Sequence, residues 1–207
     1  MKAPEICENC QKSPALCVCS AVAPVDNRVF VLILRHPQEQ DRVLGTARIT
    51  TLQLKNSLMK TGLSWANLGK ALGREADPKK WGVLFLGTAK TAEPLPDQPL
   101  SVLSKKGHPK LDQEDVLAGL EGIILLDGTW QQAKALWWRN AWLLKCQRLV
   151  LQPPQVSLYG NLRKEPRKES VSTIEAAAYT LAALEGDESL AEKILPPFRL
   201  LLEKARK

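Results

Sequence analysis

The sequence predicts an α/β fold: a mostly parallel sheet flanked by helices, preceded by a small zinc knuckle. Two observations support this prediction. Short apolar runs, which suit strands buried on both faces, alternate with longer segments of mixed polarity. Such alternation is typical of a sheet that helices cover on both sides. Four cysteines also crowd the chain ahead of the first apolar run. We therefore expect a zinc-binding segment at residues 1–27 and an α/β domain at residues 28–207.

Four apolar runs are expected to form the strands of the sheet. Each is followed by residues that favour turns, namely His36-Pro37, Gly87-Thr88, Asp127-Gly128 and Pro153-Pro154. A loop rich in proline follows the second run. The four expected strands are residues 28–34, 81–86, 122–126 and 148–151.

The segments between and after these strands are expected to contain helices. Thr129 suits the N-cap of one helix, because a threonine side chain accepts a hydrogen bond from the first helical turn. Ser172-Thr-Ile-Glu175 has the form of a capping box and is expected to open another helix. The expected helices span residues 46–60, 129–145, 172–185 and 188–205.

The charge of the chain suits a nucleic-acid partner. Lysine and arginine total 29 against 22 acidic residues, which gives a formal net charge of +7, and a basic surface attracts phosphate. Charge alone does not separate an RNA-binding protein from one that is merely soluble and basic. No apolar run reaches the roughly 18 residues that cross a bilayer, and the N-terminus lacks the apolar core of a secretory signal. We therefore expect a cytoplasmic protein with no membrane partner.

The N-terminal cysteines have the spacing of a metal site. Cys7, Cys10, Cys17 and Cys19 form the pattern Cys-x2-Cys-x6-Cys-x-Cys. Zinc binds four ligands in a tetrahedron and accepts thiolates, so two close cysteine pairs on a short loop favour one structural zinc ion. Free surface thiols or small buried residues are the alternative interpretation. Cys146 has no partner in the sequence and is expected to lie in the core.

Ligands of open parallel sheets bind beyond the carboxyl ends of the strands, so the residues that follow each strand are the candidates for a site. Asp127 directly follows four apolar residues of the third expected strand. A partly desolvated carboxylate there suits a general base, and capping of the following helix is an equal alternative. Trp130 suits stacking on a nucleobase or packing in the core.

Polar residues after the first and fourth expected strands are further candidates. His36 suits donation to phosphate, acid catalysis or the capping of a loop. Glu39 and Arg42 suit substrate binding or a simple ion pair three positions apart. The loop after the fourth strand suits phosphate binding or ordinary solvation. Its basic residues are Arg163, Lys164, Arg167 and Lys168.

The run Asp127-Gly-Thr-Trp130 resembles the Asp-x-Thr-Trp motif that names the DTW-domain family, whose members are tRNA-uridine aminocarboxypropyltransferases. The resemblance covers nearly the whole chain, and five features in the same order make it strong. Leu44-Gly45 departs from it, because the family often has an asparagine before the threonine. The features are the four N-terminal cysteines, His36-Pro37-x-Glu39 with Arg42 and Thr46, Leu126-Asp-Gly-Thr-Trp-Gln-Gln-Ala133, Tyr159 with Arg163, and Ser172-Thr-Ile-Glu-Ala176.

The resemblance implies a SPOUT-like domain with a C-terminal trefoil knot, which holds S-adenosylmethionine as co-substrate. It also implies a tRNA partner and assigns residues to each ligand. The residues implied for S-adenosylmethionine are Leu86, Gly87, Asp127, Gly128, Thr129, Leu151, Ser172 and Thr173. Those implied for the RNA substrate are His36, Glu39, Arg42, Trp130, Arg163, Lys164, Arg167, Lys168 and Glu175.

The implied reaction transfers the 3-amino-3-carboxypropyl group to N3 of a uridine and releases methylthioadenosine. Because N3 carries a proton, the reaction needs a base, and Asp127 is the candidate catalytic residue. The sulfonium is already activated, so catalysis needs no metal. The four cysteines imply no vacant coordination position, so the zinc is expected to be structural. Two alternatives remain open: a SPOUT-type RNA methyltransferase, and a zinc-containing RNA-binding protein without catalytic activity.

Overall fold

The protein contains one mixed sheet of six strands, seen in a computed structural model that describes residues 6–40, 42–84, 98–162 and 170–207. The strand order is β2-β1-β5-β3-β6-β4, and the pairs are parallel except for β4, which runs antiparallel to β6. The strands are β1 (Phe30–Arg35), β2 (Ser57–Thr61), β3 (Trp81–Leu84), β4 (Leu100–Leu103), β5 (Gly122–Asp127) and β6 (Gln147–Leu151).

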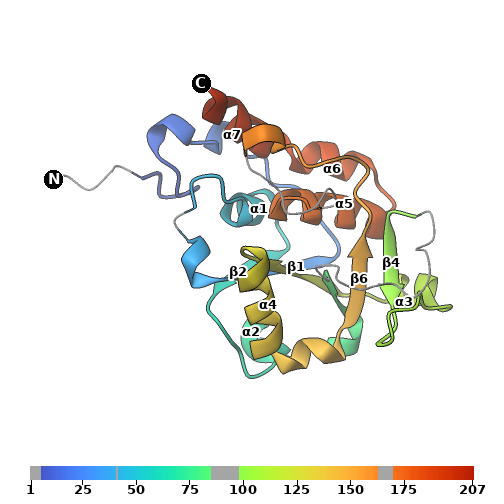
Figure 1. The fold of residues 1–207 in the computed structure, drawn as a ribbon. Coiled ribbons are helices and arrows are strands. Elements are labelled where there is room, and N and C mark those ends of the chain that lie inside the picture. The colour runs from blue at the N-terminus through green and yellow to red at the C-terminus, as the bar shows by residue number, and fades with distance from the viewer. Residues whose placement is uncertain (1–5, 41, 85–97, 163–169) are drawn as a thin grey trace.

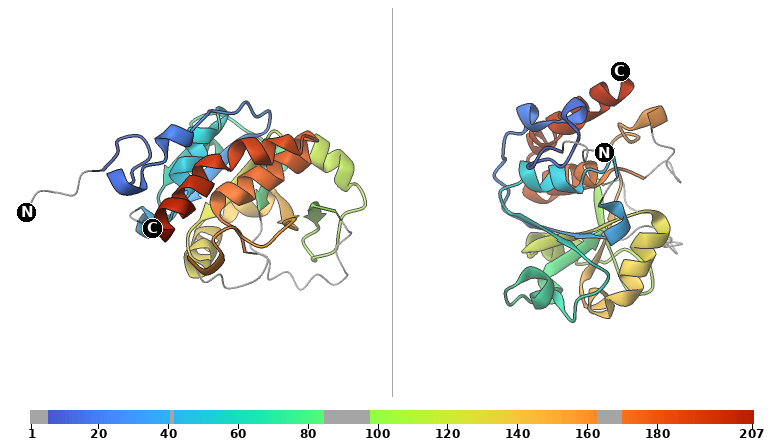
Figure 2. Two further views of the ribbon diagram at one scale, coloured as in Figure 1. Left: turned by 90° about the horizontal axis from the view of Figure 1, so that it is seen from above. Right: turned by 90° about the vertical axis from the view of Figure 1, so that its left-hand side faces the viewer.

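Helices cover both faces of the sheet, which gives three layers (Figures 1 and 2). Helices α1, α5, α6 and α7 lie on one face, and α2 and α4 lie on the other. In the part of the chain that the structure describes, no helix combines the length and apolar content that a membrane span requires. The helices are α1 (Ala47–Gln53), α2 (Leu68–Leu72), α3 (Gln113–Ala118), α4 (Trp130–Arg139), α5 (Thr173–Glu185), α6 (Ser189–Ile194) and α7 (Pro196–Arg206).

Strand β1 shows why the sheet is buried on both sides. Successive side chains of a strand point to opposite faces. Val31 and Ile33 join the hydrophobic cluster under α1, α5, α6 and α7, whereas Leu32 and Leu34 join the cluster under α2. All four side chains are fully buried. The continuous apolar run that predicted this strand is thus a consequence of burial on both faces, and the predicted α/β class is confirmed.

The prediction of one helix over residues 46–60 was wrong. Helix α1 ends at Gln53, Leu54 is extended, and the chain continues into β2. Strand β2 pairs in parallel with β1, with Ser57 opposite Val31. It lies at the edge of the sheet and is only partly buried, so its sequence lacks the continuous apolar run of a central strand. Pairing with β1 therefore determines the strand conformation here, although the local spacing of apolar residues favours a helix.

The helices predicted at residues 129–145 and 188–205 are each interrupted. Helix α4 stops before Asn140, and a 3-10 helix (Ala141–Lys145) follows. The buried amide of Asn140 donates to the carbonyls of Leu63 and Leu136, which fixes this break. The C-terminal helix is split at Pro196, because proline cannot donate the hydrogen bond that would continue α6.

The N-terminal segment packs against the sheet domain, beside α7 (Figure 1). Cys10 and Val18 are fully buried and belong to the same hydrophobic cluster as β1, α5 and α7. Lys204 of α7 donates to the carbonyl oxygen of Cys17 at 2.6 Å. Residues 6–27 are therefore in extensive contact with the rest of the chain, and the status of residues 1–27 as a separate domain stays a prediction.

Candidate active site and metal centre

A cleft lies at the carboxyl ends of β1 and β5, where the sequence placed it. The two strands are parallel neighbours, with Arg35 opposite Asp127 in the register. The backbone N–H of His36 then donates to the carbonyl oxygen of Asp127 at 2.9 Å. Both strands therefore end at one edge, from which a 3-10 helix (Pro37–Glu39) and α4 begin. Ligands of open parallel sheets bind at such an edge.

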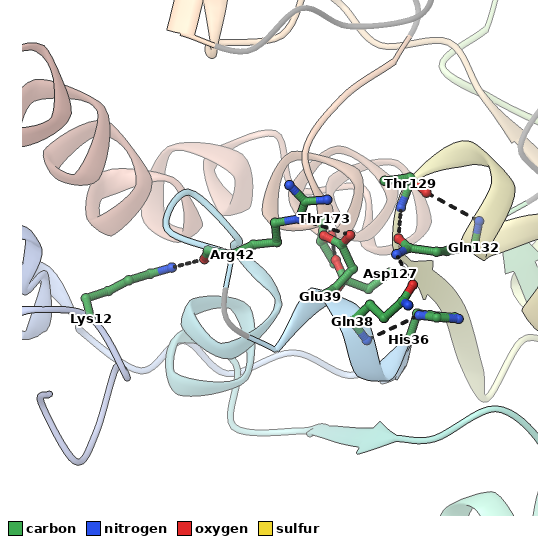
Figure 3. Close-up of polar contacts among 9 residues, drawn as sticks. All are labelled: Lys12, His36, Gln38, Glu39, Arg42, Asp127, Thr129, Gln132 and Thr173. Atoms are coloured by element: carbon green, nitrogen blue, oxygen red, sulfur yellow. Dashed lines mark hydrogen bonds and ion pairs between the residues drawn. The ribbon is translucent and has the colours of Figure 1, made fainter. Parts of the chain in front are cut away.

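Asp127 is tied to the start of α5. The hydroxyl group of Thr173 donates to Oδ1 of Asp127 at 2.5 Å (Figure 3). Thr129 is the N-cap of α4, as predicted, and forms a capping box with Gln132. The carboxylate of Asp127 is half-buried and lines the cleft. This geometry favours a role in the cleft over the alternative in which Asp127 caps α4.

Gly128 brings the chain close to the cap of α4. A Cβ atom at this position would lie 2.8 Å from Cβ of Gln132 and 3.5 Å from Cβ of His36, which leaves no room for a side chain. Gln132 also donates through Nε2 to Gln38 at 3.2 Å, which joins the start of α4 to the 3-10 helix after β1. The imidazole Nδ1 of His36 accepts from the N–H of Gln38, so His36 caps that 3-10 helix.

Glu39 places a second carboxylate beside Asp127. Its side chain is buried, whereas that of Arg42 is exposed, and the two form the expected ion pair at 3.4 Å. That contact lacks hydrogen-bond geometry, so Oε1 of Glu39 has no hydrogen-bond partner among the described residues. A buried acceptor without a donor is costly. The cleft thus contains a carboxylate oxygen that suits a donor on a ligand.

Glu175 is fully buried and is occupied by hydrogen bonds within the protein. Its carboxylate accepts from the hydroxyl of Ser157 at 2.8 Å and from the N–H of Leu158 at 2.7 Å. Ser172 donates to it through both its N–H and its hydroxyl, which completes the predicted capping box of α5. Glu175 therefore fastens the segment after β6 to the start of α5, and its predicted contact with RNA stays a prediction.

The structure brings some of the predicted site residues together and separates others. Glu39, Asp127, Gly128, Ser172 and Thr173 line the cleft, and Arg42 lines an adjoining smaller pocket. The described lining of these two pockets does not include His36, Thr129, Trp130, Leu151 or Glu175. Leu86, Gly87, Arg163, Lys164, Arg167 and Lys168 lie outside the described residues.

Several residues of the cleft were not predicted as ligand contacts. Leu84, Leu125, Leu126, Val171 and Ala176 supply an apolar wall. Thr46 and Tyr159 also line the cleft. Both belong to the family resemblance described above, and that resemblance could have identified them as residues of the site. Lys12 lines the adjoining pocket, and nothing in the sequence pattern indicated it.

The four N-terminal cysteines are grouped closely enough to hold a metal ion. Their Sγ atoms all lie within 4.8 Å of one another, with Cys7 3.6 Å from Cys19 and Cys10 3.7 Å from Cys17. Zinc–sulfur bonds of about 2.3 Å in a tetrahedron give sulfur–sulfur distances of roughly 3.8 Å. Backbone N–H groups of Cys10 and Asn9 lower the pKa of Cys7 to about 6, whereas burial and the neighbouring Cys7 raise the pKa of Cys19 to about 12. The case for metal binding therefore rests on the geometry of the four sulfur atoms. The predicted four-ligand set fits one zinc ion.

Cys146 is separate from this centre and lies in the core, as predicted. It is buried in the cluster beneath α2, together with Trp142 and Leu143. Burial raises the pKa of its thiol to about 12, so the group stays neutral at physiological pH. We therefore assign Cys146 a packing role.

Comparisons with known proteins agree with these features. A DTW domain matches residues 4–206. The tRNA-uridine aminocarboxypropyltransferase 2 of Macaca fascicularis is 26% identical over 203 residues, which cover 94% of this chain and 61% of the relative. That of Drosophila melanogaster is 29% identical and covers 94% of this chain and 72% of the relative. The tRNA-uridine aminocarboxypropyltransferase A of Arabidopsis thaliana is 26% identical, with 92% and 77% covered.

The chain spans less than two thirds of the length of the Macaca fascicularis relative. No solved structure gave a significant match. The domain match, in contrast, runs from the metal centre to α7 and includes Asp127-Gly-Thr-Trp130 at the cleft. The chain therefore belongs to the DTW-domain family.

Proposed function

We propose that this protein transfers the 3-amino-3-carboxypropyl group of S-adenosylmethionine to N3 of a tRNA uridine, with release of methylthioadenosine. The observation that carries the proposal is the pair of carboxylates, Asp127 and Glu39, in a cleft built around the family's motif. The names of the relatives support the same enzyme class.

The lining of the cleft suits S-adenosylmethionine. Apolar side chains, among them Leu125 and Val171, offer a surface for an adenine ring. Asp127 and Glu39 offer negative charge to a ligand that carries a sulfonium and an amino group. When bound, S-adenosylmethionine supplies a carbon that its sulfonium activates toward a nucleophile. Cofactor contacts of Ser172, Thr173, Gly128 and the residues around Leu151 belong to this proposal.

Asp127 acts in this proposal as the base that takes the N3 proton of uridine. N3 then forms a bond to Cγ of the transferred group, the Cγ–S bond breaks, and its electron pair stays on sulfur. Thr173 holds Asp127 through the 2.5 Å hydrogen bond, so the carboxylate keeps one orientation. Glu39 accepts a hydrogen bond from the amino group of the transferred moiety through Oε1, which has no hydrogen-bond partner among the described residues.

The tRNA approaches, in this proposal, over the loops that border the cleft. Arg42 is exposed beside Glu39, and His36 and Trp130 lie at the starts of the elements that leave β1 and β5. The basic residues at 163, 164, 167 and 168 are the proposed phosphate contacts, on the strength of the sequence alone. Glu175 acts indirectly, by positioning the start of α5.

Two further expectations belong to the same proposal. The zinc is structural, because four protein thiolates complete its coordination and leave no open position. A SPOUT-like C-terminal trefoil knot and a cytoplasmic location remain predictions that rest on the family resemblance and on the sequence.

Mass spectrometry of tRNA nucleosides tests the function. The purified protein is incubated with unmodified tRNA and S-adenosylmethionine, and the products are measured. We expect 3-(3-amino-3-carboxypropyl)uridine together with methylthioadenosine. Formation of S-adenosylhomocysteine and a methylated nucleoside would instead identify a methyltransferase. RNA binding without affinity for S-adenosylmethionine would identify a non-catalytic RNA-binding protein. The Asp127→Asn variant is the matched control for contaminating activity.

A further inference from the structure

Lys12 extends from the metal-binding segment to the loop that borders the candidate active site. It lies between Cys10 and Cys17 and is buried, with 7% of its surface exposed. Its ammonium group donates to the carbonyl oxygens of Arg42 at 3.2 Å, Val43 at 2.7 Å and Gly45 at 2.8 Å. Figure 3 shows the side chain reaching this loop. An ammonium group has three hydrogens, so three carbonyl acceptors match its capacity.

The same loop is also held by Tyr159. The phenol of Tyr159 donates to the carbonyl oxygen of Leu44 at 2.6 Å, while its ring packs edge-on against Phe198 of α7. Together, Lys12 and Tyr159 engage each carbonyl oxygen from residue 42 to residue 45. A surface loop normally directs such carbonyls to water. This one is fixed by two side chains from distant parts of the sequence.

The loop that Lys12 holds contributes directly to the cleft. Gly45 and Thr46 line the cleft together with Glu39 and Asp127, and Arg42 lines the adjoining pocket. Thr46 also accepts a hydrogen bond through Oγ1 from the N–H of Ile174, beside Thr173. A shift of the loop would therefore displace the wall opposite the start of α5.

Hydrogen bonds to three carbonyl oxygens hold the ammonium group of Lys12 at this loop. Burial lowers the pKa of its ammonium group to about 8, and the positive charge of Arg35 acts in the same direction. The negative charges of the Cys10 thiolate and, to a smaller extent, of Asp127 oppose this decrease. No ion pair with a carboxylate of the described residues is present at Lys12, so the three carbonyl contacts define its position.

We propose that Lys12 is a positioning residue, which couples the metal-held segment to the cofactor cleft by fixing the 42–45 loop. The metal centre then does more than fold its own segment: it sets the position of the lysine that shapes one wall of the cleft. The part of this inference that concerns cofactor affinity rests on the proposed function. The part that concerns the loop does not.

Two variants of the full-length protein test the proposal. Lys12→Met keeps the length of the side chain and removes its donors. Lys204→Met is the matched control, because Lys204 also donates to the metal-binding segment, at the carbonyl of Cys17, but from α7. Zinc content, hydrogen–deuterium exchange of residues 42–46 and the Kd for S-adenosylmethionine are measured for both variants and for the original sequence.

We expect Lys12→Met to retain one zinc ion, to exchange faster at residues 42–46, and to bind S-adenosylmethionine about 10- to 100-fold more weakly, as for the loss of charge-assisted hydrogen bonds. Lys204→Met should leave both exchange at 42–46 and affinity within about threefold of the original protein. Faster exchange at 42–46 without zinc loss is also expected for Tyr159→Phe, which removes the hydrogen bond to the carbonyl of Leu44.

Unchanged exchange at residues 42–46 in Lys12→Met would overturn the proposal, whether or not the protein binds S-adenosylmethionine. Faster exchange with unchanged cofactor affinity would overturn the coupling to the cleft. If the original protein does not bind S-adenosylmethionine at all, the proposed function fails, and the exchange measurement alone decides the role of Lys12. If Lys12→Met loses zinc, the same measurements on Tyr159→Phe decide the role of the loop. Unchanged exchange at residues 42–46, or unchanged cofactor affinity, in that variant would then overturn the proposal.

Discussion

Thr173 donates its hydroxyl hydrogen to Asp127 at 2.5 Å, across 46 positions of sequence. The bond joins the first residue of α5 to the last residue of β5. Hydrogen bonds to a charged acceptor are shorter and stronger than neutral ones. This hydrogen bond therefore fixes the carboxylate at the carboxyl end of β5. Substitutions of Asp127 and of Thr173 test the two residues separately.

Asp127→Asn is expected to slow the chemical step, because an amide of the same shape cannot take up the N3 proton. We expect a loss of roughly 10²- to 10⁴-fold in single-turnover rate, the usual size of a general-base contribution. The rate of the variant should recover as the pH rises toward the ionisation of free uridine N3. Near-normal turnover at neutral pH would show that Asp127 is not the base. A matching loss of S-adenosylmethionine affinity would indicate a cofactor ligand.

Thr173→Val removes the donor to Asp127 and keeps the shape of the side chain. A hydrogen bond to a charged group contributes about 1.5–3 kcal/mol, so we expect kcat to fall by roughly 10- to 100-fold. Thr173→Ser keeps the hydroxyl and should retain most of the activity. Steady-state kinetics with both variants checks this expectation. Equal rates for the valine and serine variants would leave the hydrogen bond without a role in catalysis.

Glu175→Gln is expected to destabilise the fold. The carboxylate accepts hydrogen bonds from Ser157, Leu158 and Ser172. In glutamine an NH2 group replaces one of the two oxygens, and this group would face a donor where the protein needs an acceptor. An unmet buried group costs about 1–3 kcal/mol, which urea denaturation measures as a loss in the free energy of unfolding. The exposed Glu188→Gln is the control and should stay within about 0.5 kcal/mol. Unchanged stability of Glu175→Gln would contradict the structural role.

The metal centre is expected to hold one zinc ion per chain, measured by elemental analysis after purification under reducing conditions without chelator. Cys7→Ser and Cys19→Ser should lose the ion and expose the N-terminal segment to protease before the sheet unfolds, because metal binding supplies folding free energy to that segment. Cys146→Ser should keep the ion, since Cys146 lies in the other core cluster. Absence of zinc from the unsubstituted protein in this measurement would contradict the prediction.

The basic loop is expected to contribute to tRNA binding through phosphates. Replacing Arg163, Lys164, Arg167 and Lys168 together with alanine should weaken affinity and flatten its dependence on salt, by up to about 0.7–0.9 per lost contact in a plot of log K against log salt. The double variant Lys105→Ala, Lys106→Ala removes exposed charge elsewhere and is the control. An unchanged slope for the loop variant would place the tRNA on another surface.

The sequence was informative where one local pattern determines structure. The central strands β1 and β5 are apolar throughout because both their faces are buried, and the caps of α4 and α5 depend on residues three positions apart. The edge strands β2 and β4 lacked such a signal. Strand β2 is only partly buried, and β4 is defined by antiparallel pairing with a strand far along the chain.

The site divides in the same way. Asp127 was identifiable because it follows a buried strand, and Glu39 because it belongs to a motif. Lys12 and Tyr159 were not assigned to the site, since they act on backbone carbonyls 30 to 115 positions away. Every residue has a backbone carbonyl. The sequence therefore does not indicate which carbonyl a given lysine or tyrosine side chain will hydrogen-bond.

The burial of Cys10 and Val18 in the main hydrophobic cluster has a practical consequence for protein engineering. A cut after residue 27 looks natural on the sequence, because the cysteine-rich segment ends there. Such a cut would strip apolar cover from α7 and leave three backbone carbonyls at residues 42, 43 and 45 without their shared donor. The smallest unit that can be grafted, shortened or displayed with its cleft intact therefore begins before Cys7.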